Sequence, residues 1–99
     1  MIYIDNLVCD KQAIGLWREQ GLVVNLVDLR EFYEDPYMDD ADLRIALDAL
    51  IGYDFSRDQK YVLFCQTGQR AKAAVIELKK IDADLSVYFF EGGVEAWMA

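Results

Sequence analysis

The chain has 99 residues, of which 55% are hydrophobic and 13% aromatic, so residues 1–99 are enough for a single domain with a packed core and too few for two. Its 18 acidic and 10 basic residues give a net charge of -8, which disfavours direct binding to nucleic acid and to anionic membranes. Because no apolar run reaches the roughly 20 residues of a membrane span and the N-terminus lacks the features of a signal peptide, we expect a cytoplasmic protein.

The chain contains two cysteines, Cys9 and Cys65, and no histidine. Two cysteines are too few for a disulfide framework and wrongly spaced for a Cys-rich metal site, and reduced thiols fit a cytosolic compartment. Without histidine, a Cys–His nucleophile pair and His-ligated zinc or iron sites are excluded. We therefore expect no metal and no cofactor. For Cys9 we expect an ordinary packing role, since free cysteine is among the most buried residue types.

The N-terminal segment predicts a short strand followed by a helix. The strand is expected at the β-prone residues Ile2-Tyr3-Ile4, and the helix runs from there towards Gln20. Either Asp5 or Asp10 has the short acidic side chain that caps a first helical turn, and Gly21 is suited to end the helix. The choice between the two aspartates is left open by the sequence.

A nearly continuous apolar segment, Val23 to Val27, predicts a parallel strand covered by helices on both faces. Asp28 and Arg30 follow at its carboxyl end, which is the edge where ligands bind in open α/β sheets. Two interpretations are open: these residues border an active-site crevice, or they brace the fold by ion pairing. The acidic residues considered as partners of Arg30 are Glu31, Glu34 and Glu91.

Residues 31–42 carry six acidic side chains around the only proline, Pro36, and predict a turn-rich acidic loop. The segment after this loop is ambiguous. Leu43-Arg44-Ile45 has the composition of a short strand, whereas Ala41 to Ile51 has the length of one helix. The residues that would face inward in such a helix are Leu43, Leu47, Leu50 and Ile51. Periodicity does not decide between the two in so short a segment.

The central part of the chain predicts a loop, a strand and a helix. Gly52–Asp58 forms the loop and places Phe55 in the core, and Tyr61–Phe64 forms a buried strand. Apolar residues then recur at helical spacing over Ala71–Ile81, which predicts an amphipathic helix packed on the sheet. The inward face of this helix comprises Ala71, Ala74, Val75, Leu78 and Ile81.

The last part of the chain predicts a buried strand over Ser86–Phe90, a turn at Gly92-Gly93 and a short helix over Val94–Trp97. Paired glycines allow backbone conformations that other residues rarely adopt. Helices alternate with strands throughout, and the chain has no internal repeat. We therefore expect an α/β fold, a three-layer sandwich whose mainly parallel central sheet is flanked by helices.

The segment with the clearest chemistry is Cys65-Gln66-Thr67-Gly68-Gln69-Arg70, which joins a predicted strand to a predicted helix. A cysteine at this position faces backbone N–H groups without partners inside the helix and the positive end of the helix dipole. Arg70 adds a cationic group, Gly68 permits a conformation in which several amides converge, and Thr67 adds a hydroxyl. These features favour the nucleophilic thiolate form, so Cys65 is the predicted catalytic residue.

Three blocks of sequence, in this order, resemble a single rhodanese (sulfurtransferase) domain: residues 26–31, residues 65–70 and residues 90–97. The resemblance extends from about Val23 to Trp97. It departs from the family between the first two blocks, where a Gly-His-Ile-Pro-Gly-Ala segment is usual and Tyr37-Met38-Asp39-Asp40-Ala41 stands instead. The spacing from Asp28 to Cys65 still leaves room for the same elements with altered detail.

The rhodanese resemblance implies a two-step reaction. The Cys65 thiolate takes a sulfane sulfur from a donor to form a persulfide, and a thiol or another nucleophile then removes it. Arg70 would orient an anionic donor such as thiosulfate, and Asp28, Arg30 and Glu91 would border the site. The loop amides that would stabilise the terminal sulfur belong to Gln66, Thr67, Gly68, Gln69 and Arg70. The partners implied are thiosulfate, a cysteine desulfurase or a sulfur-carrier protein.

Two other classes of function remain open. One is a non-catalytic rhodanese-like interaction module, against which the intact Cys65 and Arg70 argue. The other is a cysteine-based phosphatase or arsenate reductase, which resembles the rhodanese fold but has five residues between its cysteine and arginine. Here the spacer is four residues long, which makes a smaller cradle. The alternative role considered for Arg70 is a salt bridge to Glu91.

Overall fold

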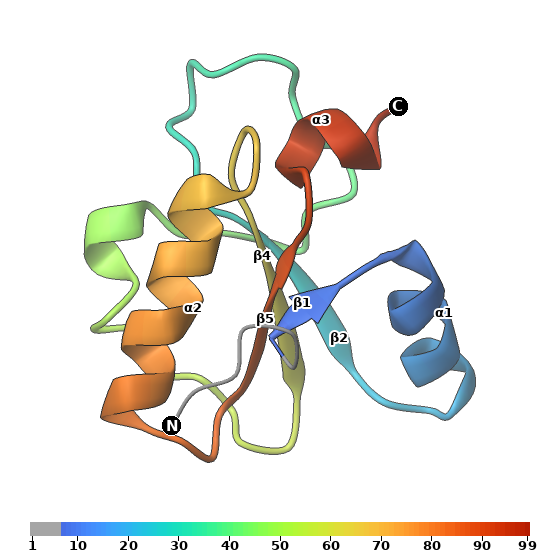
Figure 1. Cartoon of the computed structure of the whole chain (residues 1–99), viewed down its shortest axis with the longest axis vertical. Helices are drawn as coiled ribbons and strands as arrows, with labels where there is room; N and C mark the ends of the chain where they lie inside the picture. Colours follow the sequence, from blue (N-terminus) through green and yellow to red (C-terminus); the bar gives the residue numbers. More distant parts are fainter. Residues whose placement is uncertain (1–6) are drawn as a thin grey trace.

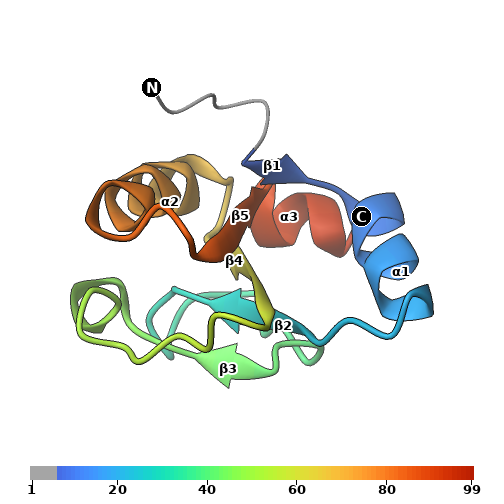
Figure 2. The same ribbon diagram turned by 90° about the horizontal axis from the view of Figure 1, so that it is seen from below.

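The computed structural model describes residues 7–99, which form a five-stranded sheet with helices on both faces (Figures 1 and 2). The strands are β1 (Val8–Cys9), β2 (Val24–Asp28), β3 (Leu43–Arg44), β4 (Lys60–Phe64) and β5 (Ser86–Phe90). Their order across the sheet is β1-β5-β4-β2-β3, and all of these neighbours pair in parallel. The predicted α/β sandwich around a parallel sheet is confirmed.

Two hydrophobic clusters form the core, one on each face of the sheet. The helix α2 (Gln69–Ile81) and the 3-10 turn η2 (Leu47–Ala49) cover one face, and the helices α1 (Lys11–Glu19) and α3 (Gly93–Trp97) cover the other (Figure 2). Successive side chains of a strand point to opposite faces. In β4, Tyr61 and Leu63 accordingly join the α2 cluster, whereas Val62 and Phe64 join the other. Both faces of the strand are buried, which explains its continuous apolar run.

The N-terminal helix is capped by Asp10. The Oδ1 atom of Asp10 accepts a hydrogen bond from the backbone N–H of Ala13 at 2.8 Å, and the helix ends just before Gly21, which has a φ of 81°. Asp5 and the strand expected at residues 2–4 lie outside the described residues. Cys9 lies in β1, one residue before the cap, and is buried among apolar side chains. The packing role expected of Cys9 is therefore confirmed.

The ambiguous segment after the acidic loop forms a strand at Leu43–Arg44, so the strand alternative is confirmed and the alternative of one helix over residues 41–51 is wrong. Leu43–Arg44 pairs with the edge of β2, and the flanking backbone N–H groups of Asp42 and Ile45 donate to carbonyls of that strand. This pairing satisfies backbone groups that a helix would leave exposed at the sheet edge. Only η2 is helical there. Of the residues that the helix alternative placed inward, Leu50 is buried, whereas Leu47 and Ile51 are exposed.

The helix after Cys65 begins at Gln69, two residues earlier than predicted, and ends at Ile81 as predicted. Four of its five predicted inward residues are buried: Ala71, Ala74, Val75 and Leu78. Ile81 is 62% exposed, so its predicted burial is wrong. It is the last residue of α2, and the backbone becomes extended at Asp82, so no further turn packs around it. Phe55 is buried as predicted and packs edge-on against Tyr61.

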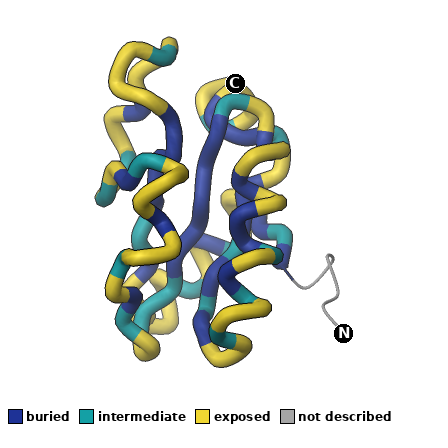
Figure 3. The backbone as a smooth tube through the Cα atoms, turned by 90° about the vertical axis from the view of Figure 1, so that its left-hand side faces the viewer, coloured by how far each residue is buried: buried dark blue, intermediate teal, exposed yellow. Residues whose placement is uncertain are grey.

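Most residues of β2, β4 and β5 are buried, whereas most of the loops and the outer faces of the helices are exposed (Figure 3). The loop after β4, the acidic segment of residues 31–42 and α3 lie together at one end of the molecule (Figure 1). This end is formed by the carboxyl ends of the parallel strands, where α/β proteins bind ligands. Within residues 7–99, none of the helices has both the length and the apolar character required to span a membrane.

Candidate active site

Cys65 lies at the carboxyl end of β4, where the chain turns into α2. Its Sγ atom accepts hydrogen bonds from the backbone N–H groups of Gly68 at 3.1 Å and Ala71 at 3.3 Å. Gly68 makes this turn possible because it has a φ of 99°, a left-handed conformation that favours glycine. Only 1% of Cys65 is exposed to solvent. The sulfur is therefore held by oriented amides in a site from which water is largely excluded.

The start of α3 supports the Cys65 loop from behind. The backbone N–H of Val94 donates to the carbonyl of Cys65 at 2.9 Å, and that of Glu95 donates to the carbonyl of Gln66 at 3.3 Å. The first N–H groups of a helix have no partners within the helix, so they are free to bind the loop. The short terminal helix predicted from the sequence thus has a positioning role that local sequence patterns did not reveal.

Gly92 and Gly93 allow this close contact. Gly93 has a φ of 63°, and a Cβ atom there would lie 2.3 Å from the carbonyl oxygen of Cys65. The neighbouring Gly92 has a φ of 81° and lies beside Gly68. A Cβ atom added to Gly68 would lie 3.2 Å from the backbone nitrogen of Gly92. The sequence predicted a turn at the paired glycines, and the structure shows that they also make room for the cysteine loop.

Arg70 lies in the first turn of α2, and its guanidinium binds Glu34 in the acidic segment. The Nη2–Oε1 distance is 2.8 Å and the Nη1–Oε2 distance is 3.3 Å. The alternative prediction that Arg70 forms a salt bridge to Glu91 is therefore wrong. Hydrogen bonding to Glu34 raises the pKa of Arg70, and the nearby Cys65 shifts the pKa of Arg70 in the same direction. The bond from Arg70 likewise lowers the pKa of the Glu34 carboxyl below its usual value.

Asp28 and Arg30 form a buried ion pair beneath the loop, with an Nε–Oδ1 distance of 3.1 Å. Arg30 also donates to the side-chain oxygen of Gln66 at 2.7 Å and to the carbonyl of Pro36 at 2.6 Å. Arg44 of β3 donates to the other carboxylate oxygen of Asp28 at 3.0 Å. Arg30 braces the fold through an ion pair, as one of the two interpretations expected, but the partner of Arg30 is Asp28. The predicted partners Glu31, Glu34 and Glu91 are wrong, because Asp28 lies two residues away on the same buried edge.

The remaining predicted site residues surround a polar hollow on the outer side of the loop. Thr67 and Gln69 are exposed, and both line this hollow of about 370 Å³ together with Glu91. Its other lining residues are Val8, Gly68, Lys72, Phe89 and Gly92. Glu91 thus lies beside the loop, as a border residue would. The side chain of Gln66 points instead to Arg30 and belongs to the support of the loop.

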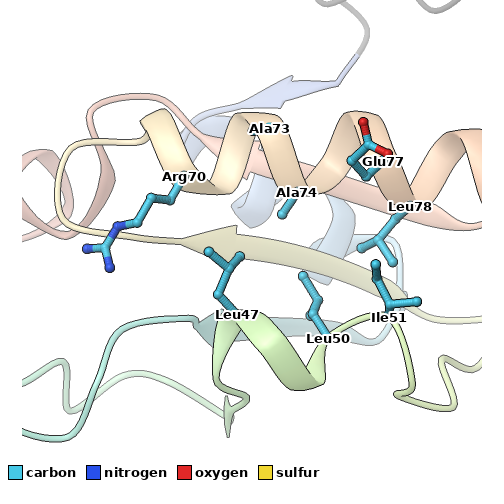
Figure 4. A pocket seen from close by; sticks show the side chains of 8 residues that line it. All are labelled: Leu47, Leu50, Ile51, Arg70, Ala73, Ala74, Glu77 and Leu78. Atoms are coloured by element: carbon cyan, nitrogen blue, oxygen red, sulfur yellow. The ribbon is translucent and has the colours of Figure 1, made fainter.

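An apolar groove lies between η2 and α2 (Figure 4). Leu47, Leu50 and Ile51 point across it towards Ala74 and Leu78, and Arg70 stands at one end (Figure 4). The volume of the groove is about 320 Å³. Arg70 therefore stands between the groove and the acidic segment.

Sequence reasoning did not assign Glu34 to the site. It named Glu34 only as one candidate partner of Arg30. A weak signal was present, since Glu34 follows closely after the carboxyl end of the β2 strand, the edge at which ligands bind. The pairing with Arg70 joins residues that are 36 positions apart, and local patterns do not report such contacts.

Taken together, these contacts can stabilise a negative charge on the sulfur of Cys65. Two backbone N–H groups donate to Sγ, and Arg70 lies in the first turn of α2. Oriented amides and cationic groups of this kind can stabilise a negative charge that develops on sulfur during a reaction. The arrangement suits covalent catalysis in which an anionic group is attached to the cysteine sulfur.

Residues 14–99 match the family model described as a rhodanese-like domain, and the chain therefore belongs to the rhodanese-like domain family. This match confirms the resemblance inferred from the three sequence blocks. No curated protein sequence matches the chain.

Solved structures of rhodanese-related proteins share the fold. The rhodanese-related protein of Thermoplasma volcanium is 23% identical, with a TM-score of 0.72 over 92% of this chain and 89% of the other. The rhodanese homologue of Thermus thermophilus is 21% identical, with a TM-score of 0.65 over 90% and 98%. The human single-domain sulfurtransferase is 18% identical, with a TM-score of 0.70 over 93% and 95%. At these identities the likeness establishes the fold.

Proposed function

We propose that the protein is a sulfurtransferase that carries a sulfane sulfur as a persulfide on Cys65. The observation that supports this most directly is the pair of hydrogen bonds from Gly68 and Ala71 to Sγ. Preorganised donors of this kind are worth about 3 kcal/mol each when they meet a developing negative charge. Membership of the rhodanese-like family supports the same reaction class.

In the first step of the proposed reaction, the Cys65 thiolate attacks the outer sulfur of thiosulfate. A new S–S bond forms on Cys65, the S–S bond of thiosulfate breaks, and sulfite leaves with the electron pair. In the second step, an acceptor thiolate or cyanide attacks the terminal sulfur of the persulfide. The product is a persulfide or thiocyanate, and the Cys65 thiolate is regenerated. Each step is a displacement at sulfur, so no external oxidant or reductant is required.

The amides of the loop would hold the terminal sulfur of the persulfide, and Arg70 would orient an anionic donor through its planar fork of N–H groups. The donor in this proposal is thiosulfate or a persulfide on a protein such as a cysteine desulfurase. The acceptor is a small thiol or a sulfur-carrier protein. A cytoplasmic location is part of the proposal, because the two free cysteines fit a reducing compartment.

The spacer between Cys65 and Arg70 favours sulfur over phosphate chemistry. The four residues Gln66 to Gln69 leave room for a terminal sulfur atom, whereas a tetrahedral oxyanion needs a wider ring of amides. An interaction module without catalytic activity would not need oriented donors around Sγ. Both alternatives predict that no sulfur atom is transferred to Cys65.

The proposal is tested by the intact mass of the protein after exposure to thiosulfate. Wild type and Cys9→Ser should each gain one sulfur atom that a reducing thiol removes, and Cys65→Ser should gain none. The same three proteins should differ in the same way in thiocyanate formation from thiosulfate and cyanide. Equal loss in both cysteine variants would contradict the single-nucleophile mechanism. Hydrolysis of aryl phosphates without persulfide formation would favour a phosphatase.

A further inference from the structure

The carboxylate of Glu34 forms an ion pair with the guanidinium of Arg70 through two hydrogen bonds. It is held by donors from two directions, because its Oε2 atom also accepts the backbone N–H of Glu31 at 2.7 Å. The N–H of Glu34 in turn donates to the carbonyl of Glu31 at 3.1 Å, which closes a tight turn. The Glu34 side chain is only 21% exposed. The hydrogen bonds of its own turn therefore position the Glu34 carboxylate for its contact with Arg70.

The ion pair with Glu34 reduces the positive charge that Arg70 can present to a sulfur donor. The guanidinium of Arg70 is close enough to Cys65 for the two groups to interact, since Cys65 contributes to the raised pKa of Arg70. Glu34 neutralises that charge and uses two of the guanidinium nitrogens. A small anion can bind Arg70 in the same way only by displacing Glu34, and the net charge of -8 adds a general repulsion. A donor that binds through contacts other than Arg70 does not have to displace Glu34.

We propose that Glu34 is a specificity-determining residue that selects against small, multiply charged sulfur donors by competing for Arg70. The inference rests on the proposed sulfur transfer and concerns the choice of donor. It implies that the preferred donors are those that bring a sulfane sulfur with little negative charge, such as a persulfide on a protein surface. Glu34 acts through Arg70, so the two residues should be coupled energetically.

The test compares two donors that differ by one charge, thiosulfate and methanethiosulfonate, in wild type and Glu34→Gln. Both transfer an outer sulfur to a thiolate and release an oxyanion of sulfur. Glu34→Gln should raise kcat/KM for thiosulfate about tenfold and for methanethiosulfonate about threefold, mainly through KM, because Coulomb energy scales with ligand charge. Equal gains with the two donors, or no gain, would overturn the proposal.

Glu31→Gln is the matched control. It removes the same charge from the same turn, and within residues 7–99 no hydrogen bond or ion pair involves the Glu31 side chain, which is exposed. Its donor preference should stay close to that of wild type. A change as large as that of Glu34→Gln would show a general charge effect and would contradict the proposal. In an Arg70→Ala background, most of the gain from Glu34→Gln should disappear, and an undiminished gain would exclude action through Arg70.

A second readout does not depend on sulfur transfer. Iodoacetate and iodoacetamide have similar sizes but differ by one charge, and the peptide that carries Cys65 reports the rate of each. Glu34→Gln should raise the ratio of the iodoacetate rate to the iodoacetamide rate about threefold, and Glu31→Gln should leave it unchanged. If no donor forms a persulfide in any variant, the proposed function fails, and this ratio still decides whether Glu34 controls the access of anions to Cys65.

Discussion

Cys9 and Cys65 are both buried, but only Cys65 has surroundings that stabilise a negative charge. The sulfur of Cys65 accepts two backbone N–H groups, whereas Cys9 has only a distant contact of 3.8 Å to the carbonyl of Asp10. Burial raises the pKa of the Cys9 thiol to about 12, and the charge of Asp10 adds to this shift. Cys9 therefore remains a neutral thiol at physiological pH, which fits a packing role.

The raised pKa of Cys9 predicts a loss of stability at alkaline pH. Unfolding lowers its pKa from about 12 to 9.0, so its contribution is fully present below pH 9.0 and is lost as the pH rises towards 12. The loss is about 1.4 kcal/mol per pH unit in that window. Urea unfolding at pH 7, 9, 10 and 11 under reducing conditions should show a shallower decline for Cys9→Ala than for wild type. Both proteins share all tyrosines and lysines, so parallel declines would refute the assignment.

At the scale of secondary-structure elements, α3 positions the loop on which the proposed chemistry depends. Its N-terminal N–H groups bind the carbonyls of Cys65 and Gln66, and Gly93 makes the approach possible. The sheet presents Cys65 at the end of β4, and the helix dipole of α2 points at the sulfur from one side. The β5–α3 connection then fixes the loop from the other side. Three elements, β4, α2 and α3, therefore hold the Cys65 loop in place.

Two glycine substitutions test this dependence. Gly93→Ala should lower the free energy of unfolding by about 2 kcal/mol or more and abolish sulfur transfer, because the new Cβ would lie 2.3 Å from the Cys65 carbonyl oxygen. Gly15→Ala is the control, since nothing lies within 4 Å of its added Cβ and Gly15 is inside α1. It should gain about 1 kcal/mol and keep full activity. Urea unfolding and thiocyanate formation measure both effects. If Gly93→Ala remained active, α3 would not be needed to position the loop.

At the scale of the whole molecule, the Asp28–Arg30 pair connects β2, the acidic segment, the Cys65 loop and β3. Arg30 binds Asp28, the carbonyl of Pro36 and Gln66, and Arg44 completes the shell of Asp28. The Arg30 and Asp28 side chains are 2% and 5% exposed. A buried charge must be paired and hydrogen-bonded, so this network holds the segments in one arrangement.

Replacing Arg30 should therefore cost much more than replacing an exposed arginine. Arg30→Ala should lower the free energy of unfolding by about 3 kcal/mol or more, because it leaves a buried carboxylate with fewer partners. Arg57→Ala is the matched control. Arg57 pairs with Asp82 at 2.6 Å, but its side chain is 63% exposed, and the loss should be below about 1 kcal/mol. Urea unfolding of the two variants at neutral pH gives the comparison, and similar losses would mean that the network adds little stability.

Features that depend on neighbouring residues could be predicted from the sequence. The apolar run before Cys65, Gly68 in the turn and the helical spacing after Ala71 define the strand, loop and helix, because backbone preferences and side-chain periodicity act over a few residues. The paired glycines are also a local signal, whereas the sequence left the choice of capping aspartate in the first helix open. Together with the order of three sequence blocks, the local signals were enough to predict the α/β fold and the family.

The partners of charged residues and the secondary structure of short segments depend on tertiary contacts. Leu43–Arg44 is a strand because the edge of β2 is free to pair with it, and Ile81 is exposed because it is the last residue of α2 and the backbone becomes extended after it. Arg70 meets Glu34 because the parallel pairing of β2 with β4 brings their carboxyl ends together across 36 positions of sequence. The identity of such a partner depends on the sheet order, which no local pattern of residues encodes.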